Sequence, residues 1–176
     1  KSGIIYTFSI KDTETIAREL LERECKVRPY HASLEPRQRS RVYKKWMDNE
    51  IQAVVATIAF GLGIDKQDCS FVIHHTLSKS MENFYQESGR CGRNGMYAES
   101  ILLYRMQDMF KISCMTFSEA NGLKNTYAMI DYANNSRMCR RDQFAKYFTE
   151  VWDDKSCGKM CDCCFYKNDN RIVRPR

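Results

Sequence analysis

Several features that would assign this chain of 176 residues to a particular class of protein are missing from its sequence. No apolar run approaches the roughly 20 residues that a bilayer-spanning helix needs, which argues against an integral membrane protein. No segment has the GxxxxGK[ST] pattern of a phosphate-binding loop, and no acidic pair stands in a DExH setting that would hold magnesium. The chain by itself therefore lacks the parts that bind and orient ATP. It also contains no low-complexity segment and no internal repeat.

The composition that is present is that of a globular protein with a buried core, since hydrophobic residues make up 43% and charged residues 28%. A length of 176 residues predicts one domain with a smaller appendage. The formal net charge of +6 favours an anionic partner, although a modest positive excess also serves solubility. The chain runs from a lysine directly into a buried-strand pattern, KSGIIYTFSI, so we expect it to be a piece of a longer protein.

Strand and helix patterns alternate along the first hundred residues. Short apolar runs predict strands over 3–8, 51–56, 70–75 and 99–104. Helical spacing predicts helices over 13–23, 36–48 and 78–86. Ser78 is expected to cap the last of these helices. The alternation predicts an α/β fold, a parallel sheet flanked by helices, with ligands beyond the carboxyl ends of the strands.

The pattern changes after Tyr104 to helical stretches that lead into a group of cysteines. We therefore expect a domain over 1–105 and a small, mostly helical domain over 106–176. In the first domain, Arg37, Arg41, Lys44 and Lys45 fall on one face of a predicted helix. That face is either solvated or in contact with a nucleic-acid backbone, and the sequence leaves both interpretations open.

Two glycine-containing loops carry candidate phosphate chemistry. In VATIAFGLGIDKQ (55–67), Gly61 and Gly63 follow a predicted strand and precede Asp65. Glycines let the backbone approach a ligand closely, and an acid beyond them can accept a hydrogen bond from a ribose hydroxyl. The alternative is a tight turn in which Asp65 caps the next segment.

The second loop, YQESGRCGRNG (85–95), carries Arg90 and Arg93 between glycines at the end of a predicted helix. Guanidinium groups match phosphoryl oxygens and can offset the charge that develops on a transferring phosphoryl group. The alternative is a pair of solvated arginines that interact with the dipole at the carboxyl end of the helix.

Nine cysteines are present, and five of them lie in the last part of the chain: Cys139, Cys157, Cys161, Cys163 and Cys164. An odd total argues against a disulfide framework. One distant thiol followed by three close ones suits a tetrahedral zinc site, with the first ligand at the start of a helix, CRRDQFAKYF. The segment CDCC offers two neighbours for the fourth position, and a set of reduced structural cysteines is the remaining alternative.

These stretches together resemble a known family. VATIAFGLGID and YQESGRCGRNG are similar to motifs V and VI of superfamily 2 helicases, and more narrowly of the RecQ DNA helicases. GIIYTFS resembles their motif IV, YHASLEP the segment after it, and the cysteines resemble the RecQ zinc-binding subdomain. The resemblance implies a second RecA-like lobe followed by that subdomain. The chain departs from the family pattern at Cys91, where alanine is usual, and at Asn94, where aspartate is usual.

The resemblance also implies roles for individual residues. Arg93 would be the arginine finger that reaches the γ-phosphate, with Arg90 and Gln86 lining the same nucleotide edge. Asp65 would contact the ribose or the closed nucleotide site, next to Gly61 and Gly63. Thr57 would contact a phosphate of a DNA strand. The structural zinc ligands would be Cys139, Cys157, Cys161 and Cys164, which leaves Cys163 as a spare, exposed thiol.

The function implied is that of an ATP-dependent 3′ to 5′ DNA helicase in the nucleus. ATP and Mg²⁺ would be held mainly by the N-terminal RecA-like lobe of the same polypeptide, and this piece would be inactive alone. The implied partners are that lobe and DNA, both single strands and duplex junctions, with no membrane partner. Two other interpretations are a non-catalytic, zinc-stabilised nucleic-acid or protein-binding module and a DEAD-box-like RNA helicase lobe.

Overall fold

A computed structural model describes residues 1–57, 60, 64–153 and 157–167 of the chain. It divides into two compact units: the first holds residues 1–78 and 82–108, and the second holds residues 79–81 and 109–176. We name them the α/β unit and the helical unit. No helix among the described residues is both long enough and apolar enough to cross a membrane.

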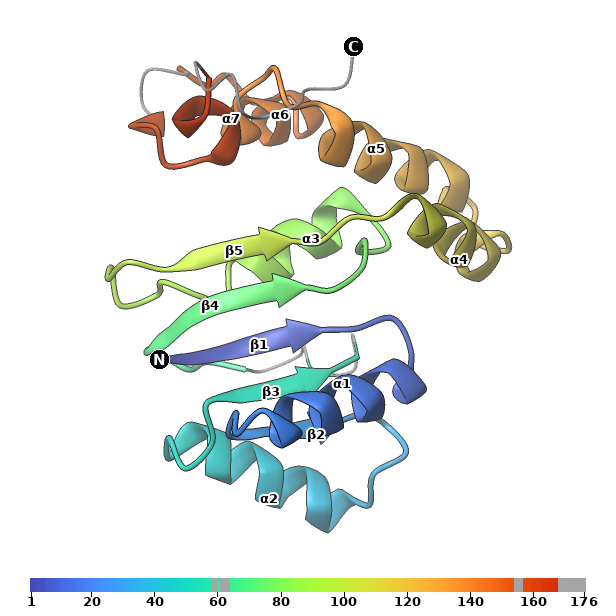
Figure 1. Cartoon of the computed structure of the whole chain (residues 1–176). Coiled ribbons are helices and arrows are strands. Elements are labelled where there is room, and N and C mark those ends of the chain that lie inside the picture. Colours follow the sequence, from blue (N-terminus) through green and yellow to red (C-terminus); the bar gives the residue numbers. More distant parts are fainter. Residues whose placement is uncertain (58–59, 61–63, 154–156, 168–176) are drawn as a thin grey trace. The chain divides into compact units, whose positions relative to one another are not determined.

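The α/β unit is built on one five-stranded sheet with the order β2-β3-β1-β4-β5. Its strands are β1 (Ser2–Tyr6), β2 (Val27–Tyr30), β3 (Ala53–Ala56), β4 (Cys69–His74) and β5 (Glu99–Leu102). Every neighbouring pair is parallel, which confirms the predicted parallel sheet. All strands therefore begin at one edge of the sheet and end at the other (Figure 1).

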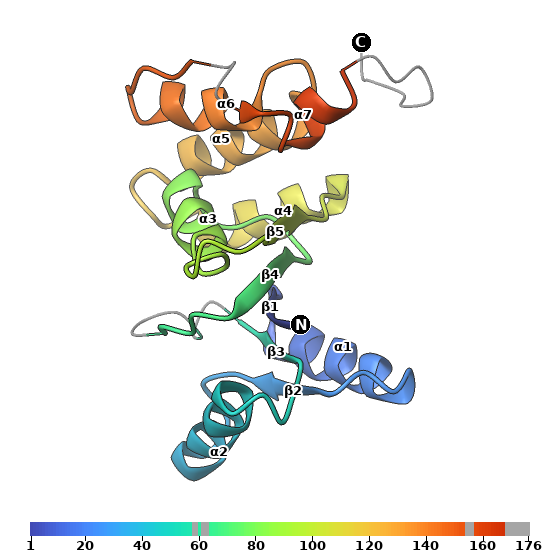
Figure 2. The same ribbon diagram turned by 90° about the vertical axis from the view of Figure 1, so that its left-hand side faces the viewer.

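Helices cover both faces of this sheet: α1 (Ile10–Glu22) lies on one face, and α2 (Pro36–Met47) and α3 (Met81–Ser88) lie on the other (Figures 1 and 2). Residues alternate between the faces because side chains of a strand point in opposite directions in turn. Ile5 packs with Ala17 of α1, whereas Ile4 packs with Trp46 of α2. The indole N–H of Trp46 donates to the carbonyl of Gly3 at 3.1 Å, which fixes α2 to the central strand.

Two details differ from the sequence-based predictions. Strand β2 was not predicted, because Arg28 and Pro29 interrupt its apolar pattern and only Val27 is buried. Helix α3 begins at Met81, and Ser78 does not cap it: the Ser78 hydroxyl donates to the carboxylate of Glu87 at 2.7 Å.

The helical unit contains α5 (Gly122–Asn134), α6 (Arg140–Tyr147), α7 (Asp162–Phe165) and most of α4 (Met106–Thr116). Helices α4 and α5 form a hairpin in which the Thr116 and Thr126 hydroxyls lie 3.2 Å apart. Gly122 allows this close approach, since a Cβ there would lie 1.8 Å from the carbonyl oxygen of Thr116. Cys139 directly precedes α6, as the sequence predicted.

Candidate nucleotide edge and metal centre

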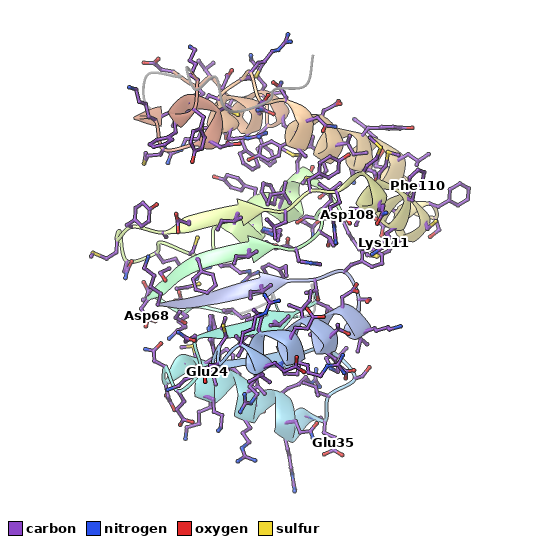
Figure 3. The ribbon with its side chains drawn as sticks, in the orientation of Figure 1. Glu24, Glu35, Asp68, Asp108, Phe110 and Lys111 are labelled. Atoms are coloured by element: carbon purple, nitrogen blue, oxygen red, sulfur yellow. The ribbon has the colours of Figure 1, made fainter. Side chains whose placement is uncertain are left out.

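Three predicted site residues of the α/β unit fall on two opposite edges of the sheet. Thr57 directly follows β3 at the edge where the strands end. Asp65 precedes the first residue of β4, and Arg93 precedes β5, at the edge where the strands begin. Figure 3 labels Asp68 at that starting edge and Glu35 at the other one. Of these three residues, only Thr57 follows the expectation that ligands lie beyond the carboxyl ends of the strands.

The starting edge brings Arg93 and Asp65 together, although they are 28 positions apart in sequence. Arg93 Nη1 donates to Asp65 Oδ1 at 2.7 Å, and the side-chain amide of Gln67 donates to the same oxygen at 2.8 Å. The two charged side chains keep 34% and 63% of their surface exposed. Solvent and a bound anion can therefore reach the guanidinium, which is the property that an arginine finger needs.

Backbone contacts hold the loop that carries Arg93. The N–H of Gly92 donates to the carbonyl of Cys69 at 2.9 Å, which ties the loop to the start of β4. Gly92 has φ of +76°, a conformation that favours glycine. Asn94 departs from the family pattern, but its amide oxygen accepts the N–H of Met96 at 3.1 Å. An asparagine thus supplies the turn contact that an aspartate would make.

Arg90 lies in the interior, in contrast to Arg93. It is only 6% exposed and sits beside the hydroxyl of Tyr6, which donates to the carbonyl of Phe60 at 2.9 Å. Burial raises the pKa of Tyr6, and the charge and hydrogen bonding of Arg90 oppose that rise. Gln86 is exposed on α3, and the predicted residues Gly61 and Gly63 lie outside the described residues. A role for Arg90 and Gln86 at the nucleotide stays a prediction.

A buried polar network beside Arg90 was missed by the sequence analysis. Glu87 is 6% exposed, and its Oε2 accepts the Ser78 hydroxyl at 2.7 Å and lies 2.9 Å from Nε2 of His74. The His74 ring stacks on Tyr6 with ring centroids 5.2 Å apart. The one available signal was an acid on α3, three positions before Arg90. The network joins the end of β4 to the helix that leads into the arginine loop.

The edge where the strands end carries a pocket of about 320 Å³ that the sequence analysis also missed. Its lining residues are Tyr30, Pro36, Arg39, Ser40 and Tyr43. Tyr30 pairs in register with Ala56, so the pocket lies on the strand next to the one that Thr57 follows. The Nε of Arg39 is buried and has no hydrogen-bond partner among the described residues. The guanidinium of Arg39 also gives this pocket a positive charge, which favours an anion.

The helical unit gathers four of its cysteine thiols into one cluster: Cys139, Cys157, Cys161 and Cys164. Their sulfur atoms all lie within 4.8 Å of one another, and Cys139 and Cys161 are 3.8 Å apart. A tetrahedral ion with Zn–S bonds of about 2.3 Å places its sulfur ligands about 3.8 Å apart. The donor set and its spacing therefore fit a four-thiolate metal site, as the sequence predicted.

The thiol chemistry of the cluster also suits a cation. Burial raises the pKa of Cys157, but the backbone N–H of Cys161 and the neighbouring thiols outweigh it and bring that pKa to about 7. Burial and neighbouring thiols raise the pKa of Cys164 instead. The sulfur atoms are so close together that a negative charge on one thiolate disfavours deprotonation of the others. A bound dication offsets this repulsion because it stabilises every thiolate.

Cys163 lies outside this cluster, and the expectation that it is exposed is wrong. It is 7% exposed, and its thiol donates to the carbonyl of Asn135 at 3.7 Å. Burial raises its pKa to about 12, so the group remains a neutral thiol. The residue packs against the end of α5 and is not a fifth metal ligand.

Comparisons with known proteins agree with both units. The family described as "Helicase conserved C-terminal domain" matches residues 1–95, and "RecQ zinc-binding" matches residues 105–165. The ATP-dependent DNA helicase Q1 of Pongo abelii is 52% identical over 93% of this chain and 25% of its own length. That of Rattus norvegicus is 51% identical over 93% of this chain and 26% of its own length. The chain thus spans about a quarter of the length of these relatives.

Solved structures share the fold. A DEAD box protein from Methanococcus jannaschii aligns with a TM-score of 0.56 and 24% identity, over 70% of this chain and 33% of that chain. The helicase family matches more than half of the present chain, and the match to the RecQ zinc-binding family begins after it, at residue 105. The chain therefore belongs to the helicase conserved C-terminal domain family, and its second part matches the RecQ zinc-binding family.

Proposed function

We propose that this chain is the part of an ATP-dependent 3′ to 5′ DNA helicase that supplies the arginine finger and a strand contact. ATP and Mg²⁺ are held mainly by an N-terminal RecA-like lobe of the same polypeptide, and Arg93 completes the site when the lobes close. The observation that carries this proposal is the exposed Arg93–Asp65 ion pair, in which Arg93 lies on the loop between α3 and β5 and Asp65 lies just before β4. A charge that compensates a transferring phosphoryl group must be placed firmly and remain reachable, and Arg93 is both.

The opposite edge supports a DNA contact. Thr57 and the pocket of Arg39 lie on neighbouring strands, so one strand of nucleic acid can reach both. A hydroxyl and a guanidinium N–H suit backbone phosphates and do not read base sequence, and the expected binding is therefore salt-dependent and tolerant of sequence. The proposed nucleotide contact at Arg93 and the proposed DNA contact at Thr57 are thus at opposite ends of the strands.

The four-thiol cluster completes the proposal as a structural zinc site. Zinc would connect the four cysteines and stabilise the fold of the helical unit. It would take no part in catalysis, because four protein ligands leave no open position for substrate. A helicase lobe of the DEAD-box kind shares the fold of the α/β unit, but the match to the RecQ zinc-binding family favours the RecQ function.

The test uses this chain alone and a chimaera in which it replaces the matching segment of the Pongo abelii helicase Q1. We expect the chain alone to hydrolyse ATP at the background rate and the chimaera to show DNA-stimulated turnover. Arg93→Ala in the chimaera should lower kcat by about 10³-fold or more, the usual contribution of an arginine finger. Arg18→Ala, at an exposed arginine of α1, is the control.

Two results would contradict the proposal. One is Arg93-dependent turnover by the isolated chain, which would mean that it holds a complete ATP site. The other is a folded chimaera whose DNA-stimulated turnover does not change in Arg93→Ala, which would favour a binding module without a catalytic arginine.

A further inference from the structure

The two residues that follow the first and third metal ligands form an ion pair, and we propose that this pair pre-organises the metal site. Arg140 follows Cys139 and Asp162 follows Cys161 in the sequence. The pair is a positioning device: it sets the spacing of two sulfur atoms before an ion binds. The inference rests on the proposed zinc site and adds to it two residues that are not ligands.

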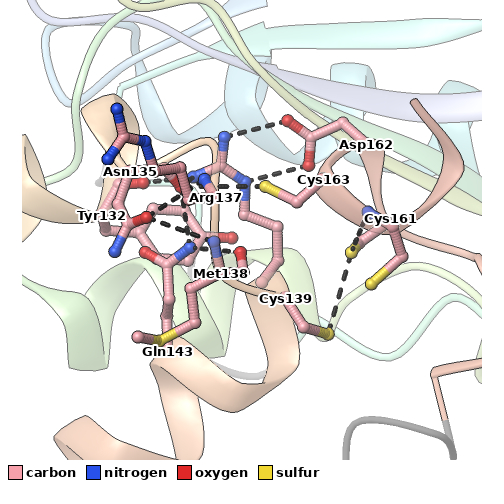
Figure 4. A network of polar contacts seen from close by, with 11 residues as sticks. Tyr132, Asn135, Arg137, Met138, Cys139, Gln143, Cys161, Asp162 and Cys163 are labelled. Atoms are coloured by element: carbon pink, nitrogen blue, oxygen red, sulfur yellow. Dashed lines mark hydrogen bonds and ion pairs between the residues drawn. The ribbon is translucent and has the colours of Figure 1, made fainter. Parts of the chain in front are cut away.

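Arg140 and Asp162 form a bidentate ion pair with two parallel hydrogen bonds, which we call the fork. Arg140 Nε donates to Asp162 Oδ1 at 2.9 Å, and Nη2 donates to Oδ2 at 2.9 Å (Figure 4). Two parallel hydrogen bonds define both the distance and the orientation of the planar groups. Adjacent Cα atoms are about 3.8 Å apart, so a fork between residues 140 and 162 also fixes the backbone of residues 139 and 161. The sulfur atoms of Cys139 and Cys161 lie 3.8 Å apart, the spacing of a tetrahedral site.

Helix α5 holds the arginine independently of any metal. Arg140 Nη1 donates to the carbonyls of Tyr132 and Asn135, the latter at 3.2 Å. The guanidinium carbon lies 5.0 Å from the centre of the Tyr132 ring, and the side chain is only 17% exposed. The fork is therefore anchored on the last turn of a 13-residue helix and is not a free surface pair.

The loop between α5 and α6 is also held at the carbonyl of Asn135. The carbonyl of Asn135 accepts the side-chain amide of Gln143 at 3.0 Å as well as the thiol of Cys163. The amide of Gln143 also donates to the carbonyl of Met138, directly before Cys139, at 2.9 Å. The buried Cys163 thus belongs to the support of the site, and its thiol lies toward Asn135 and away from those of Cys139 and Cys161 (Figure 4).

Pre-organisation should appear as metal affinity. A site whose ligands are already placed loses less conformational freedom when the ion binds, so the ion binds more tightly. Partners outside the ligand shell typically contribute about 10- to 100-fold to metal affinity. We expect Arg140→Met and Asp162→Asn each to weaken zinc binding by a factor in that range. The double variant should lose little more than either single variant, because both remove the same fork.

The experiment titrates the whole 176-residue chain with zinc against a chelator of known affinity and, separately, with Co²⁺. The absorption spectrum of bound Co²⁺ reports the ligands and their geometry. A weaker zinc affinity with an unchanged tetrahedral, four-thiolate spectrum would show that the variants keep the ligands and lose their placement. Arg141→Met, at the exposed neighbouring arginine, is the matched control and should bind zinc as the unmodified chain does.

Three outcomes would overturn the inference. Zinc affinity that is unchanged in both variants would show that the fork has no part in placing the ligands. Equal weakening in Arg141→Met would assign the effect to the loss of positive charge near the site. No zinc and no Co²⁺ bound by the unmodified chain would remove the proposed metal site itself, which separates that failure from a failure of the fork. If Arg140→Met does not fold, Asp162→Asn alone decides, because its side chain is 54% exposed and keeps its shape.

Discussion

At the scale of single residues, Glu87 is the buried carboxyl group that connects α3 to the end of β4. Its carboxylate accepts the Ser78 hydroxyl and pairs with His74, and both partners are themselves buried. Glu87→Ala leaves a histidine and a hydroxyl without their partner inside the α/β unit. Breaking a buried pair in this way costs about 3 kcal/mol or more, so we expect the free energy of unfolding of this unit to fall by about that amount.

The measurement is urea unfolding followed by tryptophan fluorescence in a Trp152→Phe background. The chain has 2 tryptophans, and this background leaves Trp46, which is fully buried in the α/β unit, as the reporter. Glu19→Ala, at an exposed acid of α1, is the control and should change stability little. A Glu87→Ala variant as stable as the control would show that the network carries no stability.

At the scale of elements, the turn between α4 and α5 depends on one glycine. An alanine at Gly122 would place its Cβ 1.8 Å from the backbone oxygen of Thr116, and a backbone atom cannot turn aside as a side chain can. Overpacking of this kind typically costs about 1 to 3 kcal/mol, and this contact is severe enough that we expect at least about 3 kcal/mol.

The loss should appear as a lower melting temperature of the helical unit, measured by circular dichroism with zinc in excess. Lys124→Ala lies two positions further along the same helix and is exposed, so it tests the general effect of alanine in that helix. Equal melting temperatures for the two variants would contradict the close approach of α4 and α5.

The elements also show what a single sequence can predict. The apolar runs of β1 and β3 stand out because these strands are buried along their whole length, and buried parallel strands are hydrophobic on both faces. Strand β5 is mostly exposed, and the apolar residues Ile101 and Leu102 are what marked it in the sequence. Strand β2 is an outer strand of the sheet, so it pairs with one neighbour only, and it carries Arg28 and Pro29. Its apolar pattern in the sequence is therefore weak.

The residues of the candidate sites also fall into those that the sequence predicts and those that it does not. Arg93 and Asp65 were predictable because glycine-rich loops and arginines are local signals. The Glu87 network and the Arg140–Asp162 fork were not, since their members lie 13 and 22 positions apart and meet only in the folded chain. The burial of Cys163 likewise depends on the end of α5, which no local pattern brings to it.

At the scale of the whole molecule, the positive charge is concentrated. The sequence of α2, PRQRSRVYKKWM, has five cations and no acid, whereas the formal net charge of the entire chain is only +6. The pocket of Arg39 lies on the same helix. Both features favour α2 as a contact for a nucleic-acid backbone over the alternative of a purely solvated face.

The prediction concerns the salt dependence of binding to a single-stranded oligonucleotide. Replacing Arg37, Arg41 and Lys44 by alanine removes three exposed cations from α2. Each phosphate contact on single-stranded DNA contributes about 0.7 to the slope of log K against log salt, so three lost contacts should flatten that slope by about 2. Fluorescence anisotropy at several salt concentrations measures both the affinity and the slope.

The control removes the same total charge from α1 and its end, with Lys11, Arg18 and Arg23 replaced by alanine. If net charge alone attracted the strand, the two triple variants would lose affinity and slope equally, because long-range attraction depends on the sum of the charges. If the α2 face contacts the phosphates, only the α2 variant should flatten the slope by about 2, since counterions are released only where phosphates are neutralised. Equal slopes in the two variants would show that the α2 cations are solvated and do not contact the phosphates, which is the alternative that the sequence left open.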